Sequence, residues 1–391
     1  MDTGSTAFIL ICSAMVCLMT PALAFFYGGL GRRKNVINTM MMSVLPLAIA
    51  SLLWVVAGYS LSFGGQGYFF GNISHLFLHG VSETTSSRGL AITGSVVGRM
   101  LFTPLAIFIV FWLLLVYYPF AHMVWGDGIL VKWGTIDFAG GDVVHITSGV
   151  SALVLAIVVG KRRDYGILEH RPHNVPFVLL GASLLWFGWF GFNAGSALAP
   201  NGLAVHALVT THFSAAAAMF SWLALEKYVT GHPTLVGAST GLVAGLVAIT
   251  PGAGFVSIWS SILIGAMVSP VCFYAISVLK KRTNYDDALD VFGCHGVGGI
   301  FGGLCTAVFT TPNLALDKAN FGLIYGNARL FVVTVLAIVF TVTWSGLVTY
   351  GIIKVIGHYI PLRVSDRDEA IGLDDCEHKE TAYPTFMGMD S

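Results

Sequence analysis

The stretch Asp137-Phe-Ala-Gly-Gly-Asp-Val-Val-His145 places a carboxylate at the start of an apolar run and an imidazole inside that run. A similar stretch, Asp290-Val-Phe-Gly-Cys-His295, opens another apolar run much later in the chain. Titratable groups inside membrane helices are costly, so by default they mark a path for a substrate or a proton. Two such pairs in matching settings predict a pathway through a helical membrane protein.

The composition around these stretches supports that prediction. Of the 391 residues, 55% are hydrophobic and only 10% are charged, against about 25% charged residues in soluble domains. The net charge is zero, which argues against nucleic acid as a partner. The six cysteines show no spacing typical of a disulfide framework or a zinc site. We interpret the first apolar run, near Ala7, as a retained helix rather than a signal peptide.

A helix needs about 20 apolar residues to span a membrane. The sequence therefore predicts an all-α polytopic domain of eleven spans over residues 1–360, followed by a polar, acidic tail over residues 361–391. The expected spans are 7–30, 38–63, 90–98, 101–124, 142–160, 175–198, 204–227, 236–251, 256–278, 290–309 and 330–360.

Basic residues indicate the orientation of these spans. If the N-terminus lies outside, only four of the 20 lysines and arginines fall in outer loops, namely Arg88, Lys132, Lys318 and Arg329. Cytoplasmic loops carry an excess of Lys and Arg. We therefore expect a protein of the cytoplasmic membrane with its N-terminus outside and its C-terminal tail in the cytosol.

The third span is too short. Only Gly89–Gly98 is uncharged and mostly apolar, and about ten residues at 1.5 Å each cover roughly half of the membrane core. The basic-residue bias nevertheless requires a crossing here, because without it the next two helices would invert. A half-helix shielded by its neighbours and a deletion in the gene both fit this pattern.

The two acid–histidine stretches open the fifth and tenth spans, which suggests two repeats of five helices and one extra helix. Repeats of an odd number of spans are inverted relative to each other, and inverted repeats place a substrate site near the membrane midplane. Glycines spaced four or so residues apart, as at Gly188, Gly191 and Gly195, predict close helix packing and a narrow pore.

Two interpretations of His145 and His295 stay open. The two rings either face each other in a narrow apolar lumen, where neutral imidazoles satisfy each other as donor and acceptor, or they are separate core histidines bonded to backbone carbonyls. A metal site is disfavoured because no third ligand is evident. We expect His206 and His212 to be structural.

The acids at the helix starts also have two interpretations. Asp137 either attracts cations near the outer mouth or caps its helix by accepting backbone N–H bonds, and we favour the structural role. Asp290 is interpreted in the same way. Asp286 and Asp287 do not form a calcium loop with Asp290, since the required Gly and distal Glu are missing.

Aromatic residues gather at two expected outer helix ends. Trp125 ends the fourth span, and Trp189 and Phe192 lie near the end of the sixth, followed by Ser196. Such residues usually form an aromatic belt at the headgroups. The alternative is a cage for a small cation held by cation–π attraction of about 0.5–2 kcal/mol, to which Ser196 adds a hydroxyl acceptor.

Nearly the whole chain resembles the Amt/Mep/Rh ammonium transporter family. The resemblance rests on the tail segment from Gly372 to Tyr383 and on Phe25-Phe-Tyr-Gly-Gly-Leu30, Ala121-His-Met-Val-Trp-Gly126, Asp137-Phe-Ala-Gly-Gly141, Gly188-Trp-Phe-Gly-Phe-Asn-Ala-Gly-Ser196 and Asp290-Val-Phe-Gly-Cys-His-Gly296.

The resemblance implies roles by motif position. Trp125 and Ser196 are expected to form the outer recruitment site for ammonium, Asp137 to support the backbone of that site, and Phe192 to be one of two gate phenylalanines. The remaining implied positions are the pore residues His145, His295 and Trp189. The family deprotonates ammonium and passes neutral ammonia by the two histidines, with the proton relayed separately.

The resemblance also implies partners. These are ammonium or its analogue methylammonium, the lipid bilayer, two further copies in a homotrimer, and a PII-type regulatory protein on the cytosolic face. It implies no cofactor and no resident metal.

The chain departs from the family pattern where the third span is short. The second gate phenylalanine of the family lies in the missing half, near Thr84, and the family's acidic residue before Arg99 is Gly98 here. Lys379 stands where a glycine is common. The leading hypothesis is an ammonium transporter, not an enzyme. The alternatives are an ammonium sensor that conducts poorly and a membrane enzyme that holds a metal on its histidines.

Overall fold

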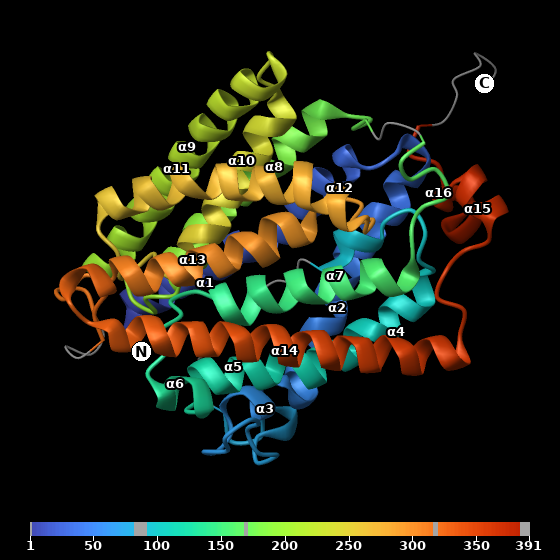
Figure 1. Ribbon diagram of the computed structural model, residues 1–391. Coiled ribbons are helices and arrows are strands. Elements are labelled where there is room, and N and C mark those ends of the chain that lie inside the picture. Colours follow the sequence, from blue (N-terminus) through green and yellow to red (C-terminus); the bar gives the residue numbers. More distant parts are fainter. Residues whose placement is uncertain (1, 82–91, 168–170, 316–319, 384–391) are drawn as a thin grey trace.

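The computed structural model describes residues 2–81, 92–167, 171–315 and 320–383. Among these residues the protein is almost entirely helical, and only two isolated β-bridges join parts of the backbone. Most of the long helices run side by side across the molecule, as Figure 1 shows. The all-α polytopic fold class is confirmed.

The long helices and helical segments follow one another along the chain. They are α1 (Thr3–Leu30), α2 with α3 (Val36–Leu53 and Tyr59–Phe63), α4 with α5 and α6 (Phe102–Trp112, Tyr118–Trp125 and Ile129–Trp133), α7 (Thr147–Val159), α8 (Val175–Gly195), α9 (Gly202–Thr230), α10 (Leu235–Ile249), α11 with α12 (Ile258–Tyr274 and Lys280–Thr283), α13 (Val297–Phe309) and α14 (Ala328–Tyr359).

Short elements complete the described part of the chain. Five π-helical turns lie within or begin the long helices, at Trp54–Gly58, Leu113–Tyr117, Gly141–Ile146, Ala275–Leu279 and Phe292–Gly296. Four 3₁₀ turns lie at Arg33–Asn35, Leu76–Leu78, Ile92–Val96 and Leu323–Tyr325. The tail forms α15 (Asp366–Ile371) and α16 (Leu373–His378).

Nine helical segments of the described residues are long and apolar enough to cross a membrane, and α10 is a shorter apolar helix. These ten coincide with ten of the eleven predicted spans. The third predicted span, 90–98, differs. Residues 90 and 91 lie outside the described residues, and so does Thr84. Ile92–Val96 forms a single 3₁₀ turn. The described residues therefore do not supply an eleventh spanning helix.

The first half of the chain nevertheless changes sides where that span was expected. The end of the molecule that holds the tail helices is called the tail end here, and the opposite end, which holds Trp125 and Ser196, the vestibule end. The amide of Ile129 donates to the Tyr68 carbonyl at the vestibule end, at 2.8 Å, and the amide of Leu101 donates to Leu362 at the tail end, at 3.0 Å. Residues 64–81 and 92–101 therefore lie at opposite ends.

Polar side chains fix where many of the helices begin. Asp2, Asn174, Asn201, Thr234, Ser257 and Asn327 each accept a hydrogen bond from a backbone N–H in the first turn of the following helix. These are the residue types preferred at the N-cap, where one such bond contributes about 1 kcal/mol. They set the ends of helices whose middles are nearly uniformly apolar.

Glycine allows α1 and α8 to pack closely. A Cβ atom added at Gly191 would lie 2.9 Å from the Cys12 carbonyl oxygen, and one added at Gly188 would also meet α1, at Met15 and Met19. Small residues let helix backbones approach in lipid, where packing rather than the hydrophobic effect drives association. The predicted close packing of helices is present at this contact.

The tail helices are bound to the membrane helices rather than separated from them. Asp374 accepts a hydrogen bond from the amide of Asn38 in α2 at 2.8 Å, and Glu377 accepts one from the amide of Phe102 in α4 at 3.0 Å. The Lys34 ammonium donates to the Glu369 carbonyl at 2.8 Å. Carboxylates at helix N-termini are favourable. The division at residue 360 stays a prediction.

Candidate functional site: vestibule and lumen

Two cavities follow each other through the molecule. The first, called the vestibule here, lies at the vestibule end and has a volume of about 540 Å³. It is lined by Trp125, Asp137, Phe192 and Ser196, among others. The second, called the lumen here, has a volume of about 70 Å³. It is lined by His145, His295 and Trp189, and also by Phe192. All seven predicted site residues thus line one of two neighbouring cavities, and Phe192 lines both.

Asp137 organises the backbone between the vestibule and α7. Its Oδ1 accepts hydrogen bonds from the amides of Gly140 and Gly141, both at 2.7 Å, and its Oδ2 accepts one from Asp142 at 2.9 Å. Gly140 has a φ of +118°, a conformation open to glycine but not to other residues without strain. The carboxylate therefore holds the loop in shape and is saturated by backbone donors.

The same loop positions Trp125. The indole Nε1 of Trp125 donates to the backbone carbonyl of Asp137 at 2.9 Å, which fixes the ring at the wall of the vestibule. In the same cavity, the Ser196 hydroxyl donates to the Phe192 carbonyl at 3.0 Å. A hydroxyl oxygen also carries acceptor lone pairs. The vestibule thus combines an indole face with a hydroxyl oxygen.

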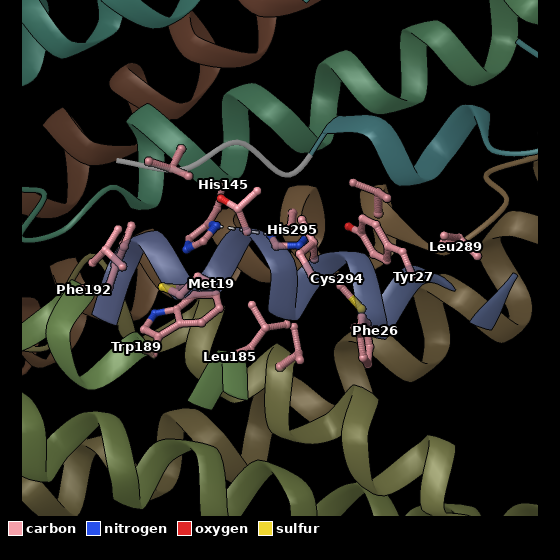
Figure 2. Close-up of a pocket in the computed structure, with 16 residues that line it drawn as sticks. Met19, Phe26, Tyr27, His145, Leu185, Trp189, Phe192, Leu289, Cys294 and His295 are labelled. Carbon is pink, nitrogen blue, oxygen red and sulfur yellow. Dashed lines mark hydrogen bonds between the residues drawn. The ribbon is translucent and has the colours of Figure 1, made fainter. Parts of the chain in front are cut away.

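The two histidines meet inside the second cavity. The Nδ1 atoms of His145 and His295 lie 3.2 Å apart, and the ring centroids lie 5.3 Å apart. Figure 2 shows this contact as a dashed line, with Phe192 toward one end of the lumen and Tyr27 and Leu289 toward the other. A hydrogen bond between two imidazoles needs one donor and one acceptor nitrogen. The geometry is that of a mutually satisfied pair.

Trp189 contacts both Phe192 and His145. Its ring stacks on His145 with a centroid distance of 5.6 Å and an interplanar angle of 23°, and it lies 5.8 Å from the Phe192 ring. Its Nε1 donates to the Thr250 hydroxyl at 3.0 Å. Thr250 is therefore a positioning residue that sequence reasoning missed, because nothing distinguishes it from other threonines of the apolar segments.

Local backbone structure brings the two histidines together. His145 lies in the π-helical turn Gly141–Ile146, and His295 lies in the turn Phe292–Gly296. Single π-helical turns are rare and often occur at functional sites. A Cβ atom added at Gly149 would collide with the backbone of Gly296. Glycine at this crossing lets the two helices approach until the rings touch.

Asp290, the acidic residue before His295, does not have the partner that the sequence predicted. The side chain that caps the start of this helix is Asp287, whose Oδ2 accepts from the Phe292 amide at 2.7 Å. Asp290 has a φ of +59° and forms an ion pair with Lys280 at 2.6 Å. Asp290 pairs with Lys280 while Asp287 accepts the helix amide, so the capping role predicted for Asp290 is wrong.

The other singled-out residues have local partners. His206 contacts the Val256 carbonyl at 2.8 Å, and His212 stacks on Trp186 at 5.2 Å. Asp286 binds Arg162 at 2.6 Å. In the described part of the chain, no three or more His, Cys, Asp or Glu side chains gather closely enough to hold a metal ion.

The sequence matches the profile of a known protein family. The profile of the Ammonium Transporter Family matches residues 7–383. The chain is a member of the ammonium transporter family.

Similar proteins share this family across nearly their whole length. The ammonium transporter of Bacillus subtilis is 43% identical over 407 residues, which take in 99% of this chain and 100% of the relative. Ammonium transporter Amt1 of Archaeoglobus fulgidus is 40% identical and covers 98% of this chain and 100% of its own. The first alignment is longer than the 391 residues here, so this family member lacks residues that its relative has.

Solved structures of the family have the same fold. A structure described as a sensor Amt protein matches with a TM-score of 0.88 and 27% identity, over 96% of this chain and 98% of that one. Saccharomyces cerevisiae Mep2 matches with a TM-score of 0.82 and 32% identity, over 93% and 88%. The family relatives are named transporters, which points to a multi-pass membrane transporter rather than an enzyme.

Proposed function

We propose that this family member carries ammonium across the membrane by binding the cation in the vestibule, removing one proton and passing neutral ammonia along the two histidines, while the proton crosses the protein by a separate relay. The observation that carries the proposal is the 3.2 Å contact between the Nδ1 atoms of His145 and His295 in a narrow cavity. Each imidazole offers its partner a donor or an acceptor, so the pair is stable without charge.

The apolar lining of the lumen supports ammonia as the permeating species. Its described lining residues include no Lys, Arg, Asp or Glu. An ion without a compensating partner in such a place costs many kcal/mol, whereas a small neutral amine crosses cheaply. Selectivity over potassium follows, because potassium has no proton to give up.

The vestibule supplies the cation site in this proposal. Trp125 offers a ring face, for which cation–π attraction is about 0.5–2 kcal/mol. Ser196 offers a hydroxyl oxygen, and Asp137 keeps the backbone between them in place. Phe192 lies between the vestibule and the lumen, and we assign it the role of a gate.

The surroundings of the pore belong to the same proposal. The excess of basic residues in the expected inner loops supports an outward vestibule and a cytosolic tail end. Family membership supports a homotrimer and a PII-type regulator on the tail-end face. The molecular mass of the detergent-solubilised protein tests the first, and co-purification with such a regulator tests the second.

Ammonium sensing with poor conduction is the second candidate function. It is favoured by the absence of a spanning helix among the described residues between Phe63 and Phe102. A structural relative is described as a sensor Amt protein. A sensor would bind ammonium in the vestibule and report through the tail helices without comparable flux.

Methylammonium uptake into liposomes tests the proposed transport. Reconstituted protein is expected to take up labelled methylammonium, with unlabelled ammonium as a competitor, and empty liposomes serve as the control. Binding of ammonium to folded protein without uptake would support the sensor and overturn the transporter.

A further inference from the structure

We propose that the vestibule also binds organic ammonium cations that are too large for the lumen, with Trp54 as the side chain that recognises them. Quaternary amines such as choline are the expected class of ligand. The inference rests on the proposed function, because it places the ligand in the cavity that recruits ammonium. It adds a second subsite to the wall of that cavity.

The volumes of the two cavities suggest this difference in size. The vestibule measures about 540 Å³, and the lumen behind Phe192 about 70 Å³. Cavities of roughly 300–1,000 Å³ are typical of sites for whole organic ligands. The vestibule is therefore far larger than one ammonium ion requires.

The vestibule wall is rich in aromatic rings. Seven aromatic side chains line it, and no Lys, Arg or His appears among its described lining residues. The seven are Trp54, Phe63, Tyr117, Trp125, Phe138, Phe192 and Phe255. Stacked or enclosing rings are the usual means of binding quaternary ammonium groups, because the ring face is negative and the cation is weakly hydrated. The lining thus favours a diffuse cation over an anion.

Trp54 is held in place on the side of the vestibule formed by the segment Val36–Phe63. Its ring contacts Phe63 at 6.1 Å and Tyr59 at 6.2 Å, both edge to face, and Tyr118 at 5.8 Å. Tyr118 is fully packed behind it, since a Cβ atom added at Gly58 would lie 2.6 Å from the Tyr118 ring. An aromatic side chain fixed in this way loses little entropy when it binds a ligand.

The charge of the vestibule lining favours a cation as well. Asp137 is the only Asp or Glu among the described residues that line the vestibule, and its carboxylate is held by backbone amides. A neutral molecule of the same shape would gain contact area but neither this attraction nor the cation–π term. Recognition should therefore distinguish a quaternary amine from its uncharged isostere.

A quaternary amine in the vestibule should block rather than permeate. It carries no N–H, so it cannot be converted into a neutral amine, and the lumen behind Phe192 is too small for it. Choline should therefore compete with methylammonium without being transported.

Choline and its uncharged isostere 3,3-dimethyl-1-butanol provide the test. Choline is expected to inhibit methylammonium uptake competitively, and the alcohol is expected to have no effect at the same concentration. Trp54→Leu should weaken inhibition about 2- to 30-fold, the range of one cation–π contact, while the KM for methylammonium changes less than about twofold. Trp54→Phe should retain most of the inhibition.

Calorimetric titration of choline into purified protein keeps this test separate from transport. Choline binding without methylammonium uptake would support the subsite and refute the proposed function, whereas uptake without choline binding would overturn the subsite alone. Equal inhibition by the alcohol, or unchanged inhibition in both Trp54→Leu and Phe63→Leu, would also overturn it. Trp133→Leu is the matched control, because Trp133 packs on Phe340 and is not among the residues that line the vestibule.

Discussion

The Nδ1 atoms of His145 and His295, 150 residues apart in the chain, lie 3.2 Å from each other inside the protein. Both rings are buried, at 2% and 5% exposure. A buried polar group that loses its partner costs about 1–3 kcal/mol. The pair therefore constrains the order of events in transport, because a charged amine beside the rings would be poorly solvated in this apolar cavity.

Replacing either histidine should alter selectivity. In His145→Asp the lumen gains a carboxylate, and in His295→Ala it gains volume, so we expect potassium or rubidium flux to rise at least about tenfold over wild type, equivalent to about 1.4 kcal/mol at the barrier. Rubidium uptake into liposomes measures this. His212→Gln is the control, since His212 is exposed and stacks on Trp186. Unchanged potassium exclusion and unchanged ammonium current in both lumen variants would argue against the paired role.

Removing the indole of Trp125 should weaken recruitment more than turnover. Trp125→Leu loses a cation–π contact of about 0.5–2 kcal/mol, so the KM for methylammonium should rise about 2- to 30-fold. The maximal rate should fall less, because Trp125 lies in the vestibule and not between the histidines. Concentration-dependent uptake separates the two parameters. A variant with an unchanged KM would show that the ring does not bind the substrate.

Neutralising Asp137 should destabilise the protein. Asp137→Asn replaces one of two accepting oxygens with an N–H donor that faces backbone donors, leaving Gly140, Gly141 or Asp142 without an acceptor. The expected loss is about 1–3 kcal/mol in the free energy of unfolding. Thermal unfolding in detergent measures it, with the exposed Asp127→Asn as the control. Equal melting temperatures for the two variants would contradict the role assigned to Asp137.

The ion pair of Asp286 with Arg162 should make stability depend on pH. Burial acts to raise the pKa of the Asp286 carboxyl, but the hydrogen bonds and charge of Arg162 outweigh burial, so this pKa is lowered from 3.8. As the pH falls, the Asp286 carboxyl is therefore protonated in the unfolded chain before it is protonated in the folded protein. The stabilisation is fully present above the unfolded pKa and is lost as pH falls through the folded one.

Asp286→Asn tests this prediction. At pH 7 it should cost about 3–5 kcal/mol, because Asp286 is fully buried and Arg162 loses its buried carboxylate partner. The difference between wild type and variant should shrink as the pH is lowered below about 4. Asp164→Asn breaks the more exposed pair with Arg32 and should cost less than about 1 kcal/mol. A difference for Asp286→Asn that stays constant with pH would be inconsistent with an ionised carboxylate.

The fold was largely predictable because lipid leaves a chain few options. Runs of about 20 apolar residues predict spanning helices, and ten of the expected spans coincide with helices. The short stretch before Arg99 could not be resolved in this way, since its ten uncharged residues fit neither a full helix nor a loop. The local sequence also predicted the wrong cap for the tenth span. Asp287, and not Asp290, accepts the backbone amide at the start of this helix.

Which residues line the two cavities was easier to predict from the sequence than which residues hold them in place. Acid–histidine spacing and the Trp-Phe-Gly-Phe stretch marked residues that line the two cavities. Thr250 and Trp54 had no such signal, because a threonine or a tryptophan in an apolar run is usually a packing residue. Their proximity to the route depends on tertiary packing, between α8 and α10 for Thr250 and around the vestibule for Trp54.

Current measurement on a solid-supported membrane tests the central claim most directly. Proteoliposomes of the wild-type protein receive pulses of ammonium or potassium at equal concentration. If the cation gives up its proton before the amine enters the lumen, and the proton crosses the protein by a separate relay, ammonium should evoke a transient current and potassium none. Equal currents from both ions would show that intact cations pass along His145 and His295, and would contradict the account.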